Sequence, residues 1–230
     1  MPFAEGILRA EGVHKAFGDT KALDGISLEV AAGELVAIMG PSGSGKSTLV
    51  HSLAGIIPVD AGSITYRSTE LSRLSDNERT TLRRTDFGFV FQFGQLLNEL
   101  SCLDNVALPL LLNRTSHDEA YRTAAQRLAE LGLTDQSDKL VGELSGGQAQ
   151  RVAVARALVH RPSVVFADEP TGSLDSLNGE RVMELLTSST KQLGTTLLLI
   201  THDPKVAAYC ERLVIVRDGR IAATEKASAS

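Results

Sequence analysis

The segment from Gly40 to Thr48, GPSGSGKST, constrains this chain more than any other part of it. It matches the pattern G-x-x-x-x-G-K-[ST] and lies between the apolar run LVAIM, residues 35–39, and a helical pattern, which is the setting that a phosphate-binding loop requires. A random chain would contain such a match only about once in a hundred. Backbone N–H groups of the loop and the start of the helix should face phosphate oxygens. The predicted nucleotide cradle consists of Gly40, Pro41, Ser42, Gly43, Ser44, Gly45, Lys46, Ser47 and Thr48. Lys46 should reach the β- and γ-phosphates, and the Ser47 hydroxyl should bind Mg²⁺.

Other apolar runs predict a parallel sheet. Residues 164–167 and 197–200 are apolar throughout, like LVAIM, as is typical of strands buried on both faces. Residues 26–30, ISLEV, alternate and predict a strand with one wet face. Residues 121–131 predict an amphipathic helix. Its apolar face should consist of Tyr121, Ala124, Ala125, Leu128 and Leu131, opposite Arg122, Gln126, Arg127 and Glu130.

The domain organisation follows from where strands are missing. About seventy residues between Phe91 and Val164 contain little that resembles a strand. We therefore expect a single catalytic unit, with a helical subdomain at residues 93–160 inserted into an α/β core at residues 1–92 and 161–225. Asp218-Gly219 lies between two apolar runs and predicts a hairpin turn, and the final AATEKASAS, including residues 226–230, should be a loose tail.

Composition excludes several functions. The net charge of −5 offers no broad basic field for a nucleic-acid backbone, so we expect no nucleic acid partner. The two cysteines, Cys102 and Cys210, form no CxxC pair and favour neither a zinc site nor a disulfide framework. The N-terminus does not resemble a signal peptide, and the apolar runs reach only about half of a membrane span. A cytoplasmic protein, held at a membrane only by a partner, is expected.

Acidic and polar residues follow the predicted strands. Asp168 and Glu169 follow the apolar run in VVFADEP, at the end of a strand where ligands of such sheets bind. Asp168 should hold Mg²⁺ through water, and Glu169 should act as general base or orient the attacking water. Alternatively, two acids could simply begin a helix. Gln92 and His202 also follow apolar strands and could contact Mg²⁺ or water and the γ-phosphate, although a lone Gln or His is more often structural.

Phe17 is a candidate for stacking on adenine. It is the only aromatic residue between Phe3 and Tyr66, and it precedes a glycine. An aromatic ring can stack on the π-face of a base. The alternative is that Phe17 belongs to the hydrophobic core.

The segment LSGGQ, residues 144–148, predicts a second anion-binding helix start. Ser145 is a favoured helix cap, and Gly146 and Gly147 allow close approach to the backbone. One ATP does not need two such termini, so this one should bind the γ-phosphate of an ATP held by another copy of the chain. As a bare helix start, the segment would be unremarkable.

The motifs GPSGSGKST, LSGGQ, VVFADEP, TGSLD and THD, in this order, resemble the ATP-binding cassette of ABC transporters over nearly the whole chain. The resemblance implies a P-loop NTPase fold of the α/β class, with a RecA-like core, an antiparallel β-subdomain and an inserted helical subdomain. It also implies a head-to-tail homodimer that hydrolyses Mg²⁺-ATP. At matching positions the resemblance implies that Lys46 and Ser47 bind phosphate and metal, that Asp168 and Glu169 are the metal ligand and the base, and that His202 is the switch histidine. It implies that Phe17 stacks on adenine and that Gln92 lies in the lid that links nucleotide to permease. It also implies that the opposite ATP is bound by Ser145, Gly146, Gly147 and Gln148, and that the loop of residues 173–175, Ser173 to Asp175, crosses the dimer. Ala149 departs from the polar residue that usually follows LSGGQ, and little effect is expected from this.

The segments EPTGSLDS and FGQLLNELSCLDNVALPLLL resemble one branch of the family, which contains lipoprotein-release, macrolide-export and FtsE-type ATPases. That branch implies a separate integral membrane permease of the FtsX/MacB type, contacted by residues 93–112, where some leucines should stay exposed. The chain could power export or extraction of a lipid, lipoprotein, peptide or antibiotic, or it could be an FtsE-like regulator of an extracellular hydrolase. A soluble ABC protein acting on DNA or ribosomes would need a coiled-coil insertion or a second cassette, and this chain has neither.

Overall fold

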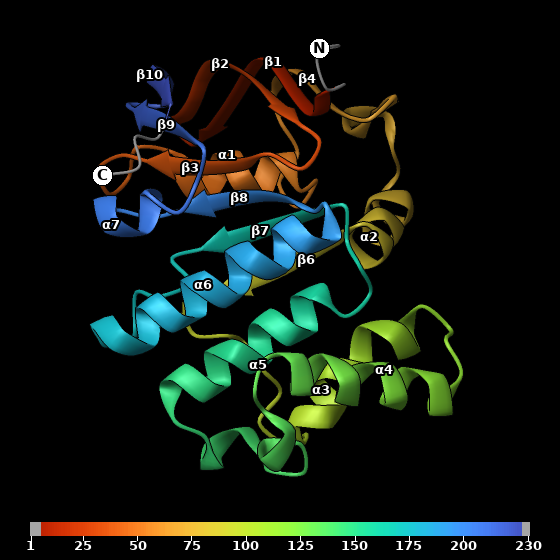
Figure 1. Ribbon diagram of the computed structural model, residues 1–230. Helices are drawn as coiled ribbons and strands as arrows, with labels where there is room; N and C mark the ends of the chain where they lie inside the picture. The colour runs from red at the N-terminus through yellow and green to blue at the C-terminus, as the bar shows by residue number, and fades with distance from the viewer. Residues whose placement is uncertain (1–5, 227–230) are drawn as a thin grey trace.

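The larger of two β-sheets forms the centre of the molecule in the computed structural model, which describes residues 6–226 (Figure 1). Its strand order is β10-β9-β3-β8-β7-β6, parallel except for the β9–β10 hairpin. Its strands are β3 (Leu35–Met39), β6 (Phe87–Phe91), β7 (Val164–Asp168), β8 (Thr196–Ile200), β9 (Arg212–Arg217) and β10 (Arg220–Lys226). The second sheet, antiparallel and ordered β2-β1-β4-β5, consists of β1 (Gly6–Phe17), β2 (Thr20–Ala31), β4 (Ala61–Tyr66) and β5 (Thr69–Glu70).

The continuous apolar runs are explained by burial on both faces of the larger sheet. In β8, Leu197 and Leu199 belong to one hydrophobic cluster, while Leu198 and Ile200 belong to the other. The first cluster also contains side chains of the helices between residues 102 and 207, and the second contains side chains of the antiparallel sheet and α1 (Lys46–Leu53). The predicted buried parallel strands, and the predicted α/β fold class, are confirmed.

The register of the sheet aligns four strand ends. Phe91 pairs with Asp168, which pairs with Ile200, and Ile200 also pairs with Ile38. The residues that follow these positions therefore emerge together at the carboxyl edge of the sheet. Gly40, Gln92, Glu169 and His202 all lie one or two residues beyond a strand of this edge.

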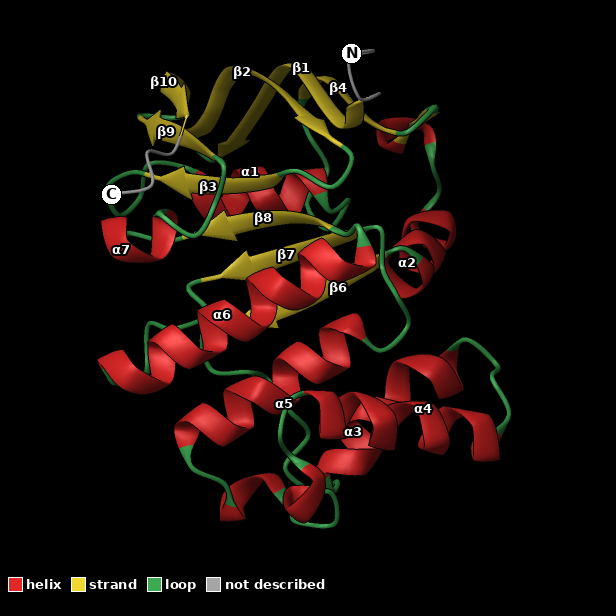
Figure 2. Ribbon diagram, in the orientation of Figure 1, coloured by secondary structure: helices red, strands yellow, loops and turns green. Residues whose placement is uncertain are grey.

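A helical lobe connects β6 to β7 and packs below the sheet (Figure 2). Its helices are α3 (Cys102–Leu112), α4 (His117–Glu130) and α5 (Gly146–Leu158), and α6 (Ser176–Leu193) and α7 (Pro204–Ala207) follow β7 and β8. No strand occurs between Phe91 and Val164, only an isolated bridge. In α4, Ala124 and Leu128 are buried, but Ala125 is exposed, so its predicted place on the apolar face is wrong. At 100° per residue, Ala125 is carried past the edge of the narrow stripe that packs on α3 and α5.

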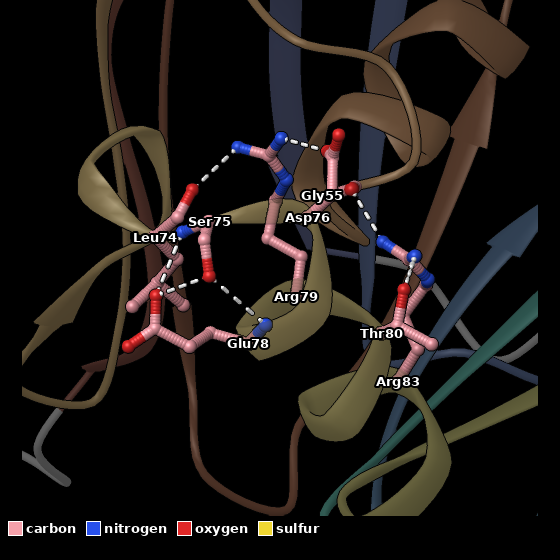
Figure 3. Close-up of polar contacts among 8 residues, drawn as sticks. All are labelled: Gly55, Leu74, Ser75, Asp76, Glu78, Arg79, Thr80 and Arg83. Atoms are coloured by element: carbon pink, nitrogen blue, oxygen red, sulfur yellow. Dashed lines mark hydrogen bonds and ion pairs between the residues drawn. The ribbon is translucent and has the colours of Figure 1, made fainter.

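Polar contacts hold α2 (Asp76–Thr85), a helix that was not among those predicted and that buries none of its side chains fully. Ser75 and Glu78 form a capping box at its start (Figure 3). Arg79 donates to the carbonyl of Leu74 and to Asp76, and Arg83 donates to the carbonyl of Gly55 at 2.6 Å. The Arg83 contact ties α2 to the segment that follows α1.

The C-terminal segment is not a loose tail as far as the structure describes it. The Asp218-Gly219 turn is a hairpin, with φ values of 49° and 72°, as predicted. Residues 222–226 continue as β10, however, and Lys226 pairs with Arg212. The prediction missed the end of this strand because residues 224–226 are polar and exposed at the sheet edge. Residues 227–230 lie outside the described residues. Within residues 6–226, no helix is long and apolar enough to span a membrane.

Candidate active site

A cavity of about 520 Å³ opens at the carboxyl edge of the larger sheet. This volume is within the usual range for small-molecule sites. The cavity is lined by Thr20, Ala22, Ser42, Gly43, Gly45, Lys46, Ser47, Thr48, Phe91, Gln92, Phe93, Gln95, Asp168, Glu169 and Ile200. Most of the predicted phosphate loop and the predicted metal and base residues therefore share one cavity.

The loop before α1 requires glycine at two positions. A Cβ atom on Gly40 would lie 2.0 Å from the carbonyl oxygen of Val216, and one on Gly45, at φ 103°, would lie 2.2 Å from that of Ala22. Gly45 also leaves the start of α1 without a side-chain cap. The first N–H groups of α1 consequently have no side-chain acceptor and can bind an anion in the cavity. Pro41 is exposed, and Ser44 is buried beside Gly40; neither they nor Gly40 line the cavity.

The Lys46 side chain folds back onto the first residues of this loop. Its ammonium donates to the carbonyls of Gly40 at 2.9 Å and Pro41 at 2.8 Å. The two contacts hold the cation beside the loop and against the cavity, where it can attract phosphate oxygens.

Glu169 has an unusual backbone conformation. Its φ is 46°, and its N–H donates to the carbonyl of Ile200 at 3.0 Å. A non-glycine residue in the left-handed region is strained by roughly 1–3 kcal/mol, and such residues concentrate at functional sites. Because the N–H is bound to β8, Glu169 does not begin a helix, and the alternative that Asp168-Glu169 is only a helix start is excluded. The next helix, α6, begins at Ser176.

His202 is paired with Glu169. Its Nδ1 lies 2.7 Å from Oε1 of Glu169, although the ring does not line the cavity. The hydrogen bond and charge of Glu169 raise the pKa of His202 above its ordinary value. The pair therefore favours an imidazolium next to the predicted base.

The titration of His202 should report this contact. Its folded-state pKa is raised, so the pairing should be fully present below the unfolded value of about 6.5 and lost as pH rises through the folded value. In NMR, the midpoint of the His202 ring protons should lie above the ordinary range and return to it in Glu169→Gln. A midpoint that is the same in both proteins would exclude the contact in solution.

The three predicted metal residues, Ser47, Gln92 and Asp168, all line the cavity. The described residues contain no group of three or more His, Cys, Asp or Glu that could hold a metal by themselves. Mg²⁺ typically uses one or two protein oxygens together with water and phosphate oxygens, so a hydroxyl, an amide and one carboxylate fit this ion.

Gln92 is also in contact with the TGSLD loop. A Cβ atom on Gly172 would lie 2.8 Å from Nε2 of Gln92, and the Ser173 hydroxyl donates to the carbonyl of Gln92 at 3.0 Å. A side chain at position 172 would displace the Gln92 amide from this position. The predicted dimer-crossing loop and the predicted metal-contacting loop therefore touch within one chain.

Phe17 lies at the end of β1 and is 52% exposed. The alternative that it is a core residue is therefore excluded. The Lys15 ammonium lies 5.5 Å from the centre of the ring and is itself bound to Asp60 at 2.7 Å. Phe17 does not line the cavity, but Thr20 and Ala22, which follow it in the β1–β2 hairpin, do.

The residues of LSGGQ lie outside the cavity. Ser145 caps α5 by accepting from the N–H of Gln148 at 3.3 Å, and Gln148 accepts in return from the N–H of Ser145 at 2.9 Å. A Cβ atom on Gly147 would lie 2.7 Å from Oδ1 of Asn178, so a larger residue there would displace the Asn178 side chain. Asp175 caps α6 by accepting from the N–H of Asn178 at 3.0 Å. Ser145, Gly146, Gly147, Gln148 and Asp175 all lie outside the lining of the cavity.

Several lining residues were not predicted as site residues: Thr20, Ala22, Phe91, Phe93, Gln95 and Ile200. Phe91 and Ile200 are the last residues of strands that end at the cavity, and this position is the signal that could have identified them. Thr20 and Ala22 come from the other sheet, and no local pattern relates them to the phosphate loop.

A parallel sheet with a glycine loop, a lysine and strand-end carboxylates at one edge, and an inserted helical lobe, define a P-loop nucleotide-binding protein. The family model described as "ABC transporter" matches residues 23–172, and the chain belongs to this family. Relatives include the lipoprotein-releasing system ATP-binding protein LolD of Bacteroides thetaiotaomicron, 43% identical over 94% of this chain and 99% of that protein. Another is the bacitracin export ATP-binding protein BceA of Halalkalibacterium halodurans, 40% identical over 94% and 87%.

Solved structures agree with this assignment. A dimeric ATP-binding cassette in a post-hydrolysis state, bound to ADP and Pi, has a TM-score of 0.88 at 37% identity and covers 96% of this chain and 99% of its own. The cbiO1 protein of Clostridium perfringens, part of the ABC transporter complex cbiONQ, has a TM-score of 0.88 at 32% identity and covers 96% and 88%. The predicted family, branch and P-loop fold are confirmed: the chain is an ATP-binding subunit of an ABC transporter.

Proposed function

We propose that this chain binds Mg²⁺-ATP at the cavity, hydrolyses it when two copies close head to tail, and thereby drives a separate membrane permease of the FtsX/MacB type. One observation carries the proposal. Lys46, Asp168 and Glu169 share a cavity, while the capped start of α5 at Ser145 lies outside it on the helical lobe.

Phosphate and metal binding are assigned to one side of the cavity. The N–H groups of the loop and of α1, together with Lys46, bind the β- and γ-phosphates. Ser47, Gln92 and Asp168 would hold Mg²⁺, directly or through water, and the ion would neutralise charge on the phosphates. Phe17 belongs to the β1–β2 hairpin that contributes Thr20 and Ala22 to the lining, and its exposed ring would stack on adenine.

Water activation is assigned to Glu169. One of its oxygens is bound to His202, so the second is free to accept a hydrogen bond from the attacking water. His202 holds the carboxylate in place and can donate from its other nitrogen to the γ-phosphate. A strained backbone and a paired histidine keep the carboxylate in one orientation before the reaction.

The second copy supplies what the cavity lacks. The backbone N–H groups after Ser145 and the α5 dipole favour an anion, and the cavity of the same chain does not include them. In a two-fold dimer, each of two sites would combine the phosphate loop of one chain with Ser145 to Gln148 of the other, with Asp175 in the loop that crosses between them. The dimeric state of the ADP-bound relative supports this arrangement.

The contact with a permease is assigned to residues 93–112. Among the aliphatic residues of this segment, Leu97 and Leu112 are exposed and Val106 is buried. The half-buried ones are Leu96, Leu100, Leu103, Leu108, Leu110 and Leu111. Phe93 is 78% exposed. The protein would thus sit on the cytoplasmic face of the membrane, and the relatives named for lipoprotein release and bacitracin export favour export over an FtsE-like regulatory role.

A cysteine crosslink tests the permease contact. Both native cysteines are buried, so Leu97→Cys offers one accessible thiol, and Ile56→Cys, at a residue of similar exposure after α1, is the matched control. In cells that contain the permease, position 97 should crosslink to an integral membrane protein and position 56 should not. Crosslinks from position 97 that map only to the chain itself would overturn the proposed contact.

A further inference from the structure

The loop after β6 makes a tight left-handed turn. Gly94 has φ 65° and Gln95 has φ 47°, and their N–H groups donate to the carbonyls of Phe91 at 2.9 Å and Phe93 at 2.7 Å. Gly94 adopts this conformation freely, but Gln95 is strained in it and depends on contacts from elsewhere. The turn follows Gln92 directly, so its position fixes where the Gln92 amide and the Phe93 ring lie.

The carbonyls of this turn converge on a single guanidinium. Arg156, on α5, donates to the carbonyl of Gly94 at 2.7 Å and to that of Gln95 at 2.8 Å. No ion pair among residues 6–226 involves Arg156. Burial without a carboxylate lowers the pKa of Arg156, so its charge is compensated chiefly by these two carbonyl dipoles.

A second residue of α5 holds the same loop. Gln150 is only 2% exposed, and its amide donates to the carbonyl of Phe91 at 2.8 Å. Ala153 lies between Gln150 and Arg156 on α5 and packs against Gly94. A Cβ atom added to Gly94 would lie 3.4 Å from the Cβ atom of Ala153. Residues 150, 153 and 156 are spaced by three and therefore lie along one face of the helix.

We propose that Arg156 is a positioning residue that fixes the loop carrying Gln92 to the flank of α5. This inference rests on the proposed function, in which α5 begins with the residues that bind the nucleotide of the opposite copy. The two hydrogen bonds from Arg156 to the loop are called the clamp below. When α5 moves toward that nucleotide, the clamp makes Gln92 and Phe93 move with it. Closure of the dimer therefore moves both the metal-contacting Gln92 and the permease-facing side of the loop.

The geometry demands arginine rather than any cation. Two separate nitrogens of the planar guanidinium, Nη1 and Nη2, bind the two carbonyls, whereas lysine carries a single nitrogen that cannot occupy both positions. Arg156→Lys therefore keeps the charge and removes the clamp. Arg151→Lys is the matched control, because Arg151 is also partly buried on α5 but donates to the carbonyl of Leu131, outside the loop.

The test uses a spin label on Phe93→Cys, since the native cysteines are buried. Without nucleotide, the label should be less mobile in the otherwise unaltered chain and in Arg151→Lys than in Arg156→Lys. Gln150→Leu, which removes the neighbouring contact, should give an intermediate spectrum and serves if Arg156→Lys folds poorly. Equal mobility of the label in all four proteins overturns the clamp, whatever the protein does with ATP.

Turnover gives a second readout that a purely structural role would not move. Measured without the label, Arg156→Lys should lower kcat for ATP about tenfold and leave the Kd for ATP within about twofold, since the phosphate loop is untouched. Gln92→Ala should lower turnover further in the unaltered chain than in the Arg156→Lys background. Fully additive losses would contradict the clamp, while failure of the unaltered chain to bind ATP would instead refute the proposed function.

Discussion

Glu169→Gln should bind ATP as tightly as the unaltered chain and lose about 100- to 1,000-fold of its turnover. Glutamine has nearly the same shape but cannot accept a proton from water, so the phosphate and metal contacts persist while the reaction stalls. The strained backbone at φ 46° should persist as well, because the N–H bond to Ile200 does not involve the side chain. Steady-state phosphate release and equilibrium nucleotide binding measure the two properties separately.

The matched control for this variant is Glu180→Gln, at an exposed carboxylate on α6 outside the cavity lining. It should hydrolyse ATP at the unaltered rate. Turnover in Glu169→Gln within a few-fold of the unaltered chain would remove Glu169 from the mechanism.

Ser145→Arg should lower turnover by about 100-fold or more, although Ser145 lies outside the cavity of its own chain. The long side chain would occupy the space in which the γ-phosphate of the opposite copy is to bind. Nucleotide affinity of the isolated subunit should not change, because no residue of its own cavity is altered. Turnover and single-subunit ATP affinity therefore have to be measured on the same preparation.

A control must separate this effect from the loss of a helix cap, which destabilises a protein by about 1 kcal/mol. Ser75 heads α2 with the same kind of capping box as Ser145. Ser75→Arg should therefore show a similar loss of stability and normal turnover. Unaltered turnover in homogeneous Ser145→Arg would contradict a site shared between two copies.

The sequence predicted the parts of the fold that depend on local pattern. β3, β7 and β8 are buried on both faces, so their sequences are apolar throughout and could be recognised without a partner strand. The phosphate loop could also be recognised from the sequence. Backbone atoms of Val216 and Ala22 leave no room for a side chain at positions 40 and 45, so glycine occurs at both positions of the motif.

Contacts that depend on distant backbone atoms left no such pattern. The guanidinium of Arg156 binds carbonyls 61 and 62 residues away, and a carbonyl belongs to every residue type. Polar α2 and the end of β10 were missed because neither carries an apolar face that would show a period. The proposal that the site is divided between the cavity of one chain and Ser145 of another came from a different argument. One ATP does not need two anion-binding helix starts, so the second was assigned to the ATP of another copy.

The mass of the Glu169→Gln variant in Mg²⁺-ATP tests this division most directly. Without nucleotide, sedimentation should give the 24.5 kDa of a single chain; with saturating Mg²⁺-ATP, it should give twice that mass with two ATP molecules bound, and adding Ser145→Arg should restore the single-chain mass. A species that binds ATP fully and stays at 24.5 kDa would show that one chain makes a complete site, and would contradict the account.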